Sequence, residues 1–393
     1  MYSSRATLTN FYFLTWKKKM RQTAYNLITD VKHLFGIVVA LSMTACSTPA
    51  QMLQSTASKP QYLYAVNAAS RTISAYRINP STGALTQVPG SPFATNDSLF
   101  ITINPASTFA YTQDFFNGTI SAFRINAATG ALTPVPGSPF STGFEASRIA
   151  INPAGTFAYV SSMSSHTISA YRIDASTGAL NPIPRSPFSV ALEKPSSVTI
   201  DPAGSFIYTN TGSIFSINAS SGVLTPVRSR TLAHGNDISS ITISPNGTFA
   251  YISAQKTISV YHVNAATGDL TSIPGSPFSQ QAVPEISPSV TINAAGTVAY
   301  VADSNLNSYS GISTFSINLS NGALTEIPGS PFVVGTSMAP VVLSPAGTFI
   351  YQGGTGQSIS ALRIDPATGA LTPISGSPFP AGHNPDSIAV ARP

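Results

Sequence analysis

Residues that could do chemistry are sparse in this chain and fall in polar segments just before short apolar runs. Arginine and lysine bind carboxylates and phosphates through charge-assisted hydrogen bonds, and histidine or glutamate can transfer protons. Residues of these types stand at Asp97, Glu145, Arg148, Glu193, Lys194, His234, Asp237, Glu285, His383 and Asp386. The candidates for catalysis are Arg148, Glu193, His234 and Glu285, and those for ligand binding are Glu145, Arg148, Lys194, Asp237, His383 and Asp386.

The same residues also suit solvated loops in which opposite charges pair with little effect on stability. Both interpretations stay open from the sequence. His166 lies in another polar loop, from which its side chain could reach the same face of the protein as the candidate residues. His262 follows Tyr261 in an apolar run, where similar segments carry arginine, so we expect it to pack or to lie at the rim.

Motifs for metal and nucleophile chemistry are missing from the sequence. It contains no Asp-x-Asp-x-Asp-Gly loop for calcium and no pair of histidines with ligand-like spacing. Gly-x-Ser-x-Gly is also absent, which argues against a nucleophile elbow. The single cysteine, Cys46, can form neither an internal disulfide nor a cysteine-rich metal site. We therefore expect no metal and no cofactor.

The net charge of +5 belongs to the start of the chain. The first 46 residues hold six of the 19 basic residues and one of the 14 acidic ones, so the remainder balances at thirteen of each. Charged residues make up only 8% of the chain, and apolar residues make up 42%. A neutral main body gives no reason to expect nucleic-acid binding.

Residues 1–46 have the pattern of a bacterial secretion signal. Basic residues precede an apolar run at 34–41, which is too short to span a bilayer as a mature helix. The ending Met43-Thr44-Ala45-Cys46 resembles the bacterial lipobox, which implies lipidation of Cys46 and attachment to a membrane. Ser47 resembles the outer-membrane sorting pattern, so we expect a protein of the cell envelope. Residues 47–60 are polar and without pattern, as in a flexible tether.

Residues 61–393 consist of seven copies of one unit. The phrase Thr-Gly-Ala-Leu-Thr-Pro-Val-Pro-Gly-Ser-Pro-Phe recurs with variations about every 47 residues, which is the length of one four-stranded propeller blade. Its first glycine stands at Gly83, Gly130, Gly178, Gly222, Gly268, Gly322 and Gly369. The sequence therefore predicts an all-β, seven-bladed β-propeller with four antiparallel strands in each blade. A β-solenoid or a two-sheet sandwich is the alternative, although solenoid repeats are usually shorter.

The third unit illustrates the strands expected within a blade. We expect strands at 148–151, 156–161, 167–173 and 179–183, separated by turns that contain Gly155 and Gly178. The first unit begins at a second strand, and the chain ends with a first strand at 386–390, so the two ends should share one blade. We expect the phenylalanine that ends each phrase to fill gaps between blades, at Phe93, Phe140, Phe188, Phe278, Phe332 and Phe379.

The repeats resemble the lactonase-like seven-bladed propellers, the family that includes the propeller-type 6-phosphogluconolactonase. The resemblance rests on Ile-Asn-Pro-Ala-Gly-Thr-Phe-Ala-Tyr at 151–159 and on Thr-Ile-Ser-Ala-Tyr-Arg-Ile-Asp at 167–174. Active members tend to carry a histidine just before the first strand of a blade. The matching positions here are Phe100, Arg148, Ser197, Ser240, Ser289, Pro340 and Ser387. None is histidine, and only Arg148 has a charged head.

Two functions follow as expectations. The first is a lipid-anchored binding or interaction module. It would be a monomer that holds an unknown small molecule, glycan or protein at the funnel face, which is the face of the propeller where loops surround the opening of the central axis. The second, implied by the resemblance, is a lactone hydrolase acting on a sugar lactone in the axial funnel. The low charge and the missing histidines favour the first, and fold analogy alone supports the second.

Overall fold

The computed structural model divides the chain into two units, residues 1–58 and residues 59–393. The structure describes the second unit, at residues 59–190, 194–229, 238–254, 257–279, 289–304, 310–335, 340–354 and 356–393. Lipidation of Cys46, the secretion signal and most of the tether therefore lie outside the described residues. Within these ranges, no helix has the length and apolar character needed to cross a membrane.

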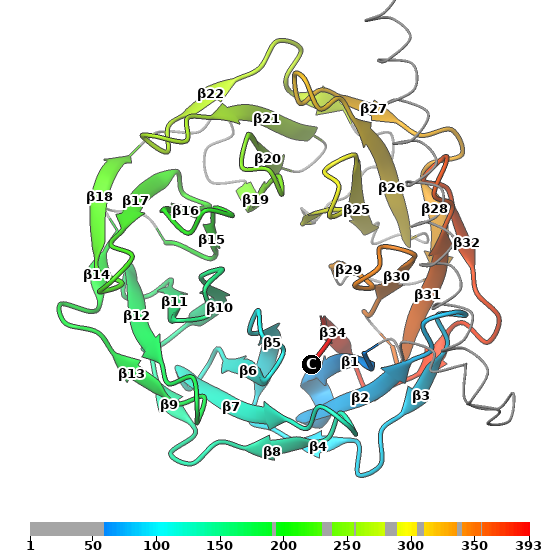
Figure 1. The fold of residues 1–393 in the computed structure, drawn as a ribbon, viewed down its shortest axis with the longest axis horizontal. Helices are drawn as coiled ribbons and strands as arrows, with labels where there is room; N and C mark the ends of the chain where they lie inside the picture. Colours follow the sequence, from blue (N-terminus) through cyan, green and yellow to red (C-terminus); the bar gives the residue numbers. More distant parts are fainter. Residues whose placement is uncertain are drawn as a thin grey trace, which may run out of the picture. The chain divides into compact units, whose positions relative to one another are not determined.

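Seven sheets stand around a common axis, as Figure 1 shows. The innermost strands are β34 (Pro385–Ala391), β5 (Ser98–Ile103), β10 (Ala146–Ile151), β15 (Val198–Ile200), β19 (Ile238–Ile243), β24 (Val290–Ile292) and β29 (Val341–Leu343). We number the blades 1 to 7 in this order. The second strands are β1 (Gln61–Asn67), β6 (Phe109–Asp114), β11 (Phe157–Ser162), β16 (Phe206–Thr209), β20 (Phe249–Ala254), β25 (Val298–Ser304) and β30 (Phe349–Gln352).

The outer strands continue each blade toward the rim. The third strands are β2 (Thr72–Ile78), β7 (Thr119–Ile125), β12 (Thr167–Ile173), β17 (Ser213–Ile217), β21 (Thr257–Val263), β26 (Ser310–Ile317) and β31 (Ser358–Ile364). The fourth strands are β3 (Leu85–Gln87), β8 (Leu132–Pro134), β13 (Leu180–Pro182), β18 (Leu224–Ser229), β22 (Leu270–Ser272), β27 (Leu324–Glu326) and β32 (Leu371–Pro373). One short 3₁₀ helix, η1 (Ala68–Ser70), links β1 to β2. The predicted blades are confirmed, and the strand bounds expected for blade 3 agree within about two residues.

The two ends of the described chain meet in blade 1. Strand β1 pairs antiparallel with β34, and the sheet order is β3-β2-β1-β34. Tyr64 lies opposite Ala389 in this register. The predicted closure, with three strands from the start and one from the end, is confirmed. Because β34 pairs with β1, blade 1 has a complete set of four strands and no inner strand is left unpaired.

Blades are held together by an aromatic ring of one blade that packs on a glycine turn of the next. In blade 2, Phe109 lies against Gly178 of blade 3, where an added Cβ would come within 2.3 Å of the ring. Two residues later, the fully buried Tyr111 donates its hydroxyl hydrogen to the Gly178 carbonyl oxygen at 3.0 Å. The other tyrosine-to-glycine bonds are Tyr64–Gly130 at 2.8 Å, Tyr159–Gly222 at 2.9 Å, Tyr251–Gly322 at 3.2 Å and Tyr351–Gly83 at 2.9 Å.

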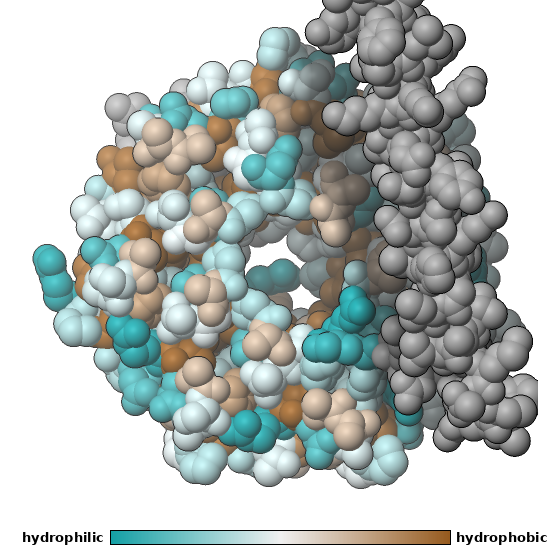
Figure 2. Space-filling model, viewed as in Figure 1, coloured by the Kyte–Doolittle hydropathy of each residue, from teal (hydrophilic) through white to brown (hydrophobic). Residues whose placement is uncertain are grey.

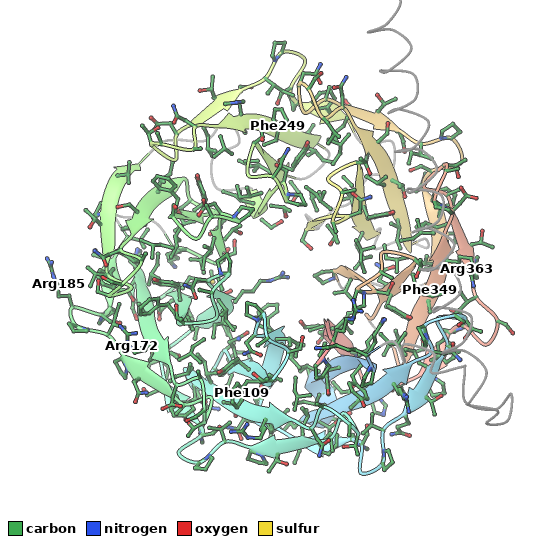
Figure 3. All side chains as sticks on the ribbon, in the orientation of Figure 1. Phe109, Arg172, Arg185, Phe249, Phe349 and Arg363 are labelled. Carbon is green, nitrogen blue, oxygen red and sulfur yellow. The ribbon has the colours of Figure 1, made fainter. Side chains whose placement is uncertain are left out.

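Arginines of the third strands reinforce this contact near the rim. The Arg172 guanidinium lies 4.7 Å from the centre of the Phe157 ring and donates to the Ser220 carbonyl oxygen of blade 4 at 3.0 Å. Arg363 and Phe349 repeat the arrangement in blade 7, where Figure 3 labels them side by side. Each arginine thus joins a cation–π contact to a hydrogen bond across the blade interface. Histidine takes the arginine position in blade 5.

The Ser-Pro-Phe segment leads into a fifth, short strand beside the third strand in six blades. These strands are β4 (Phe93–Ala94), β9 (Phe140–Ser141), β14 (Phe188–Ser189), β23 (Phe278–Ser279), β28 (Phe332–Gly335) and β33 (Phe379–Pro380). The serine hydroxyl accepts a third-strand N–H, as from Ala170 to Ser186 at 2.9 Å. The phenylalanines are partly buried and pack against the apolar clusters between blades, as expected. Blade 4 lacks the segment.

The glycine turns provide a test of this packing. Gly178 and Gly247 both have positive φ, +81° and +74°, but only Gly178 faces an aromatic ring. An alanine in the left-handed region costs about 1 kcal/mol, and forced overpacking costs about 2 kcal/mol more. We expect Gly178→Ala to lower the free energy of unfolding by about 3 kcal/mol and Gly247→Ala by about 1 kcal/mol, measured by denaturant titration. Equal losses would contradict the packing role.

Candidate functional site

The inner strands of all seven blades surround an axial cavity of about 390 Å³. Figure 2 shows its opening in the middle of the ring. The volume lies at the lower end of the range for small-molecule sites. Its wall combines β-branched side chains with serine and threonine hydroxyls, and each blade contributes residues from its first strand.

The positions that the resemblance singled out all lie on this wall. They are Phe100, Arg148, Ser197, Ser240, Ser289, Pro340 and Ser387, one from each blade. The repeat places them at the same height, because each occupies the same point of its blade. Among the described residues that line the cavity, Arg148 is the only charged one. The result is a neutral polar ring with a single cation.

Arg148 is held against the ring of the neighbouring Phe100. The guanidinium carbon lies 4.9 Å from the centre of the Phe100 ring, which is a cation–π distance. The side chain keeps partial contact with solvent through the open cavity, yet protein atoms surround it closely. This loss of solvation lowers the pKa of Arg148 from its ordinary value. Within the described part of the chain, no carboxylate forms an ion pair with Arg148.

Hydroxyl groups of the inner strands connect neighbouring blades along the cavity wall. Thr199 donates to the Ile241 carbonyl oxygen at 2.6 Å, and Thr242 donates to the Val290 carbonyl oxygen at 2.7 Å. Thr102 and Thr291 repeat the contact. In the opposite sense, the Ile101 N–H donates to the Ser387 hydroxyl at 3.2 Å. Because the Ser387 oxygen accepts this bond, its hydroxyl hydrogen points away from the Ile101 N–H. An anion in the cavity could accept that hydrogen.

The remaining described candidates do not join Arg148 on the cavity wall. The residues in question are Asp97, Glu145, His166, Lys194, His262, His383 and Asp386. Lys194 and His383 are exposed, and the His383 N–H donates to the Ser70 hydroxyl at 3.0 Å. Asp97 forms an ion pair with Arg71, outside the axial cavity. His262 packs edge-on against Phe249, with ring centres 6.0 Å apart, which agrees with the expected packing role.

Four other sequence candidates fall outside the described residues. These are Glu193, His234, Asp237 and Glu285. Their proposed roles in catalysis and ligand binding stay predictions. In the ranges that the structure describes, no group of three histidine, cysteine, aspartate or glutamate residues could hold a metal ion.

The described wall supports binding chemistry. A guanidinium with flanking hydroxyls can hold a carboxylate by charge-assisted hydrogen bonds. The groups that most often act in acid–base catalysis are imidazoles and carboxylates. None lines the described part of the cavity. The contact between Phe100 and Arg148 was not predicted from the sequence. The shared repeat position of the two residues, one blade apart, could have indicated it.

Comparison with known proteins assigns the family. The sequence profile of the family described as "Lactonase, 7-bladed beta-propeller" matches residues 100–236 and 228–339, which together span more than half of the chain. The chain belongs to this lactonase family of propellers. The family match agrees with the resemblance seen in the repeats. No curated protein matches the sequence.

Solved structures of other propellers share the fold. A putative 6-phosphogluconolactonase from Bacteroides fragilis aligns with a TM-score of 0.71 and 19% identity, covering 86% of this chain and 99% of that one. A periplasmic gluconolactonase from Pseudomonas aeruginosa aligns with a TM-score of 0.67 and 15% identity, covering 86% of this chain and all of the other. At such identities the likeness to these lactonase-type propellers establishes the fold alone.

Asp386 gives a test of the electrostatics beside the cavity. Burial raises the pKa of its carboxyl above the ordinary value, so the folded state binds the proton more tightly than the unfolded state. The favourable contribution of the protonated form is therefore present at low pH and lost as the pH rises through the raised pKa. We expect Asp386→Asn to raise the unfolding temperature at pH 7 and to leave it unchanged at pH 3, in thermal scans.

The matched control is Asp174→Asn. Asp174 is an exposed turn residue whose pKa is lowered to about 2 by hydrogen bonds from Ser176 and Thr177. Asparagine makes the equivalent turn bonds at Asn126. The control should show no stabilisation at pH 7. A gain at pH 7 in both variants, or in neither, would contradict the burial effect at Asp386.

Proposed function

We propose that this propeller is a lipid-anchored envelope protein that binds a small sugar acid or related carboxylate in its axial cavity. The observation that carries the proposal is Arg148, the one charged residue on the described part of the cavity wall, where hydroxyl groups accompany it. A guanidinium in a partly desolvated site attracts an anion more strongly than one in bulk water. One positive charge balances one carboxylate, which favours a monoanionic ligand.

The position of Arg148 supports binding of this kind. Phe100 limits the conformations of the guanidinium before the ligand arrives, which reduces the entropy lost on binding. Hydroxyls on the same wall, including Ser197 and Ser240, can hydrogen-bond the hydroxyl groups of a sugar acid. The anchor would be the lipid expected on Cys46, which keeps the propeller at the membrane surface.

Hydrolysis of a sugar lactone is the second candidate function. The names of the similar structures, 6-phosphogluconolactonase and gluconolactonase, favour it. In a reaction of this class, Arg148 would stabilise the negative charge that develops on the lactone carbonyl oxygen. Water would still need a base, and the described wall offers only hydroxyls for that role. Because Arg148 supports binding without a further group, whereas hydrolysis also needs a base, we place binding of the acid ahead of turnover of the lactone.

Calorimetry with gluconate, together with an indicator assay for acid release from glucono-1,5-lactone, separates the two functions. We expect the detergent-solubilised protein to bind gluconate without accelerating lactone hydrolysis. Loss of a charge-assisted hydrogen bond costs about 1.5–3 kcal/mol, so Arg148→Ala should weaken binding by about 10-fold to 100-fold. Lys194→Ala, which removes an exposed cation outside the cavity wall, is the matched control and should bind normally.

Each function has a result that would exclude it. Absence of gluconate binding, or binding that Arg148→Ala leaves unchanged, would contradict the binding proposal. Lactone turnover that Arg148→Ala abolishes and Lys194→Ala preserves would replace it with hydrolysis.

A further inference from the structure

A second pocket lies at the interface of blades 1 and 2, apart from the axial cavity. It has a volume of about 370 Å³ and shares no lining residue with the axial cavity. The segments that form it are the link from η1 to β2, the link from β4 to β5, and the turn between β6 and β7. Its polar lining residues are Arg71, Thr95, Asn96, Asp97, Asp114, Asn117 and Thr119.

One wall of the pocket is an ion pair. The Arg71 Nε forms a close contact with Asp97 Oδ1, and both side chains are accessible to solvent. The pair presents carboxylate oxygens and guanidinium hydrogens side by side. Adjacent donors and acceptors of this kind match the adjacent hydroxyls of a sugar ring, each of which can both donate and accept.

The opposite wall is built on a buried carboxylate. Asp114 is only 1% exposed, and it accepts hydrogen bonds from the Asn117 backbone N–H at 2.9 Å and the Asn117 side-chain amide at 2.8 Å. This arrangement fixes the orientation of the Asn117 amide at the pocket edge. Rigid polar groups bind with a smaller loss of entropy than mobile ones.

Thr119 also lines the pocket. Its hydroxyl oxygen is buried and has no hydrogen-bond partner among the described residues. A buried polar atom left without a partner costs about 1–3 kcal/mol, so such atoms are rare in folded proteins.

Exposed aromatic rings stand beside these polar groups. Phe116 is 67% exposed, directly before Asn117, and Phe144 is 69% exposed. The loops that carry them are joined, because the Thr142 N–H donates to the Gly118 carbonyl oxygen at 2.9 Å. Exposed apolar residues that gather within a rim of polar groups are a feature of ligand-binding surfaces. Such rings pack well on the apolar C–H faces of sugars.

We propose that this pocket is a saccharide-binding site for neutral sugars, separate from the axial cavity. Polar residues hydrogen-bond the sugar hydroxyls, and Phe116 and Phe144 contact an adjoining sugar unit. A cation fits the pocket less well, because the Asp97 carboxylate is already paired with the Arg71 guanidinium. The site would let an envelope propeller hold a glycan at its edge while the axial cavity is free for another ligand.

Arg71→Gly is a clean variant for testing the site. Arg71 has φ +53°, and glycine occupies the equivalent position before the third strand of blade 2, where Gly118 has φ +61°. The substitution therefore removes the guanidinium while the backbone keeps a conformation that glycine favours. Asp97→Asn removes the charge at nearly constant shape, and Phe116→Ala removes an exposed ring without disturbing the core.

The probes are the neutral trisaccharides cellotriose and N,N′,N″-triacetylchitotriose, and binding is measured by saturation-transfer NMR and calorimetry on the full chain. We expect at least one trisaccharide to bind, with affinity reduced about fivefold or more by each of the three variants. Arg148→Ala, in the axial cavity, should bind the trisaccharide normally, so failure of this site is distinguishable from failure of the acid-binding site. No binding of either sugar at about 10 mM, a ligand concentration far above typical dissociation constants, would overturn the proposal. Binding unchanged in Arg71→Gly and Phe116→Ala would also overturn it.

Discussion

Within the described residues, six of the seven blades place an aromatic ring of the second strand on a glycine of the next blade, and in five of them a buried tyrosine also binds the same turn. The glycine must have positive φ to form the turn and must lack a side chain to admit the ring. One residue type therefore meets two demands, which explains why every copy of the repeat carries it. The last of these contacts, from Tyr351 to Gly83, joins blade 7 to blade 1 and closes the ring.

Because the second strands hold neighbouring blades together, the residues on the inner strands can serve other roles. Because the aromatic and arginine contacts lie on the second and third strands, residues that face the axis can differ between blades without loss of these contacts. The equivalent axial positions accordingly hold four serines, a proline, a phenylalanine and an arginine. The same reasoning applies to the loops at the edge of blades 1 and 2, where polar and aromatic residues gather on a scaffold that does not depend on them.

The repeat allowed the blade count, the shared closing blade and most strand bounds to be predicted, since period and turn glycines are local features of sequence. The contact of Phe109 with Gly178 could not be predicted, because it depends on how neighbouring sheets stack. Arg148 was placed correctly on the axis by its position in the repeat. Lys194 and His383 lie in loops, where the repeat does not determine side-chain direction, so their absence from the cavity wall needed the structure.

Tyr208 offers the most direct test of the interface, because its buried hydroxyl has no hydrogen-bond partner among the described residues, unlike that of Tyr159. The free energy of unfolding should therefore be measured for Tyr159→Phe and Tyr208→Phe by denaturant titration. We expect Tyr159→Phe to lose about 1–2 kcal/mol, since the Gly222 carbonyl is left unpaired, and Tyr208→Phe to lose almost nothing. Equal losses in the two variants would contradict the claim that the tyrosine-to-glycine bond holds neighbouring blades together.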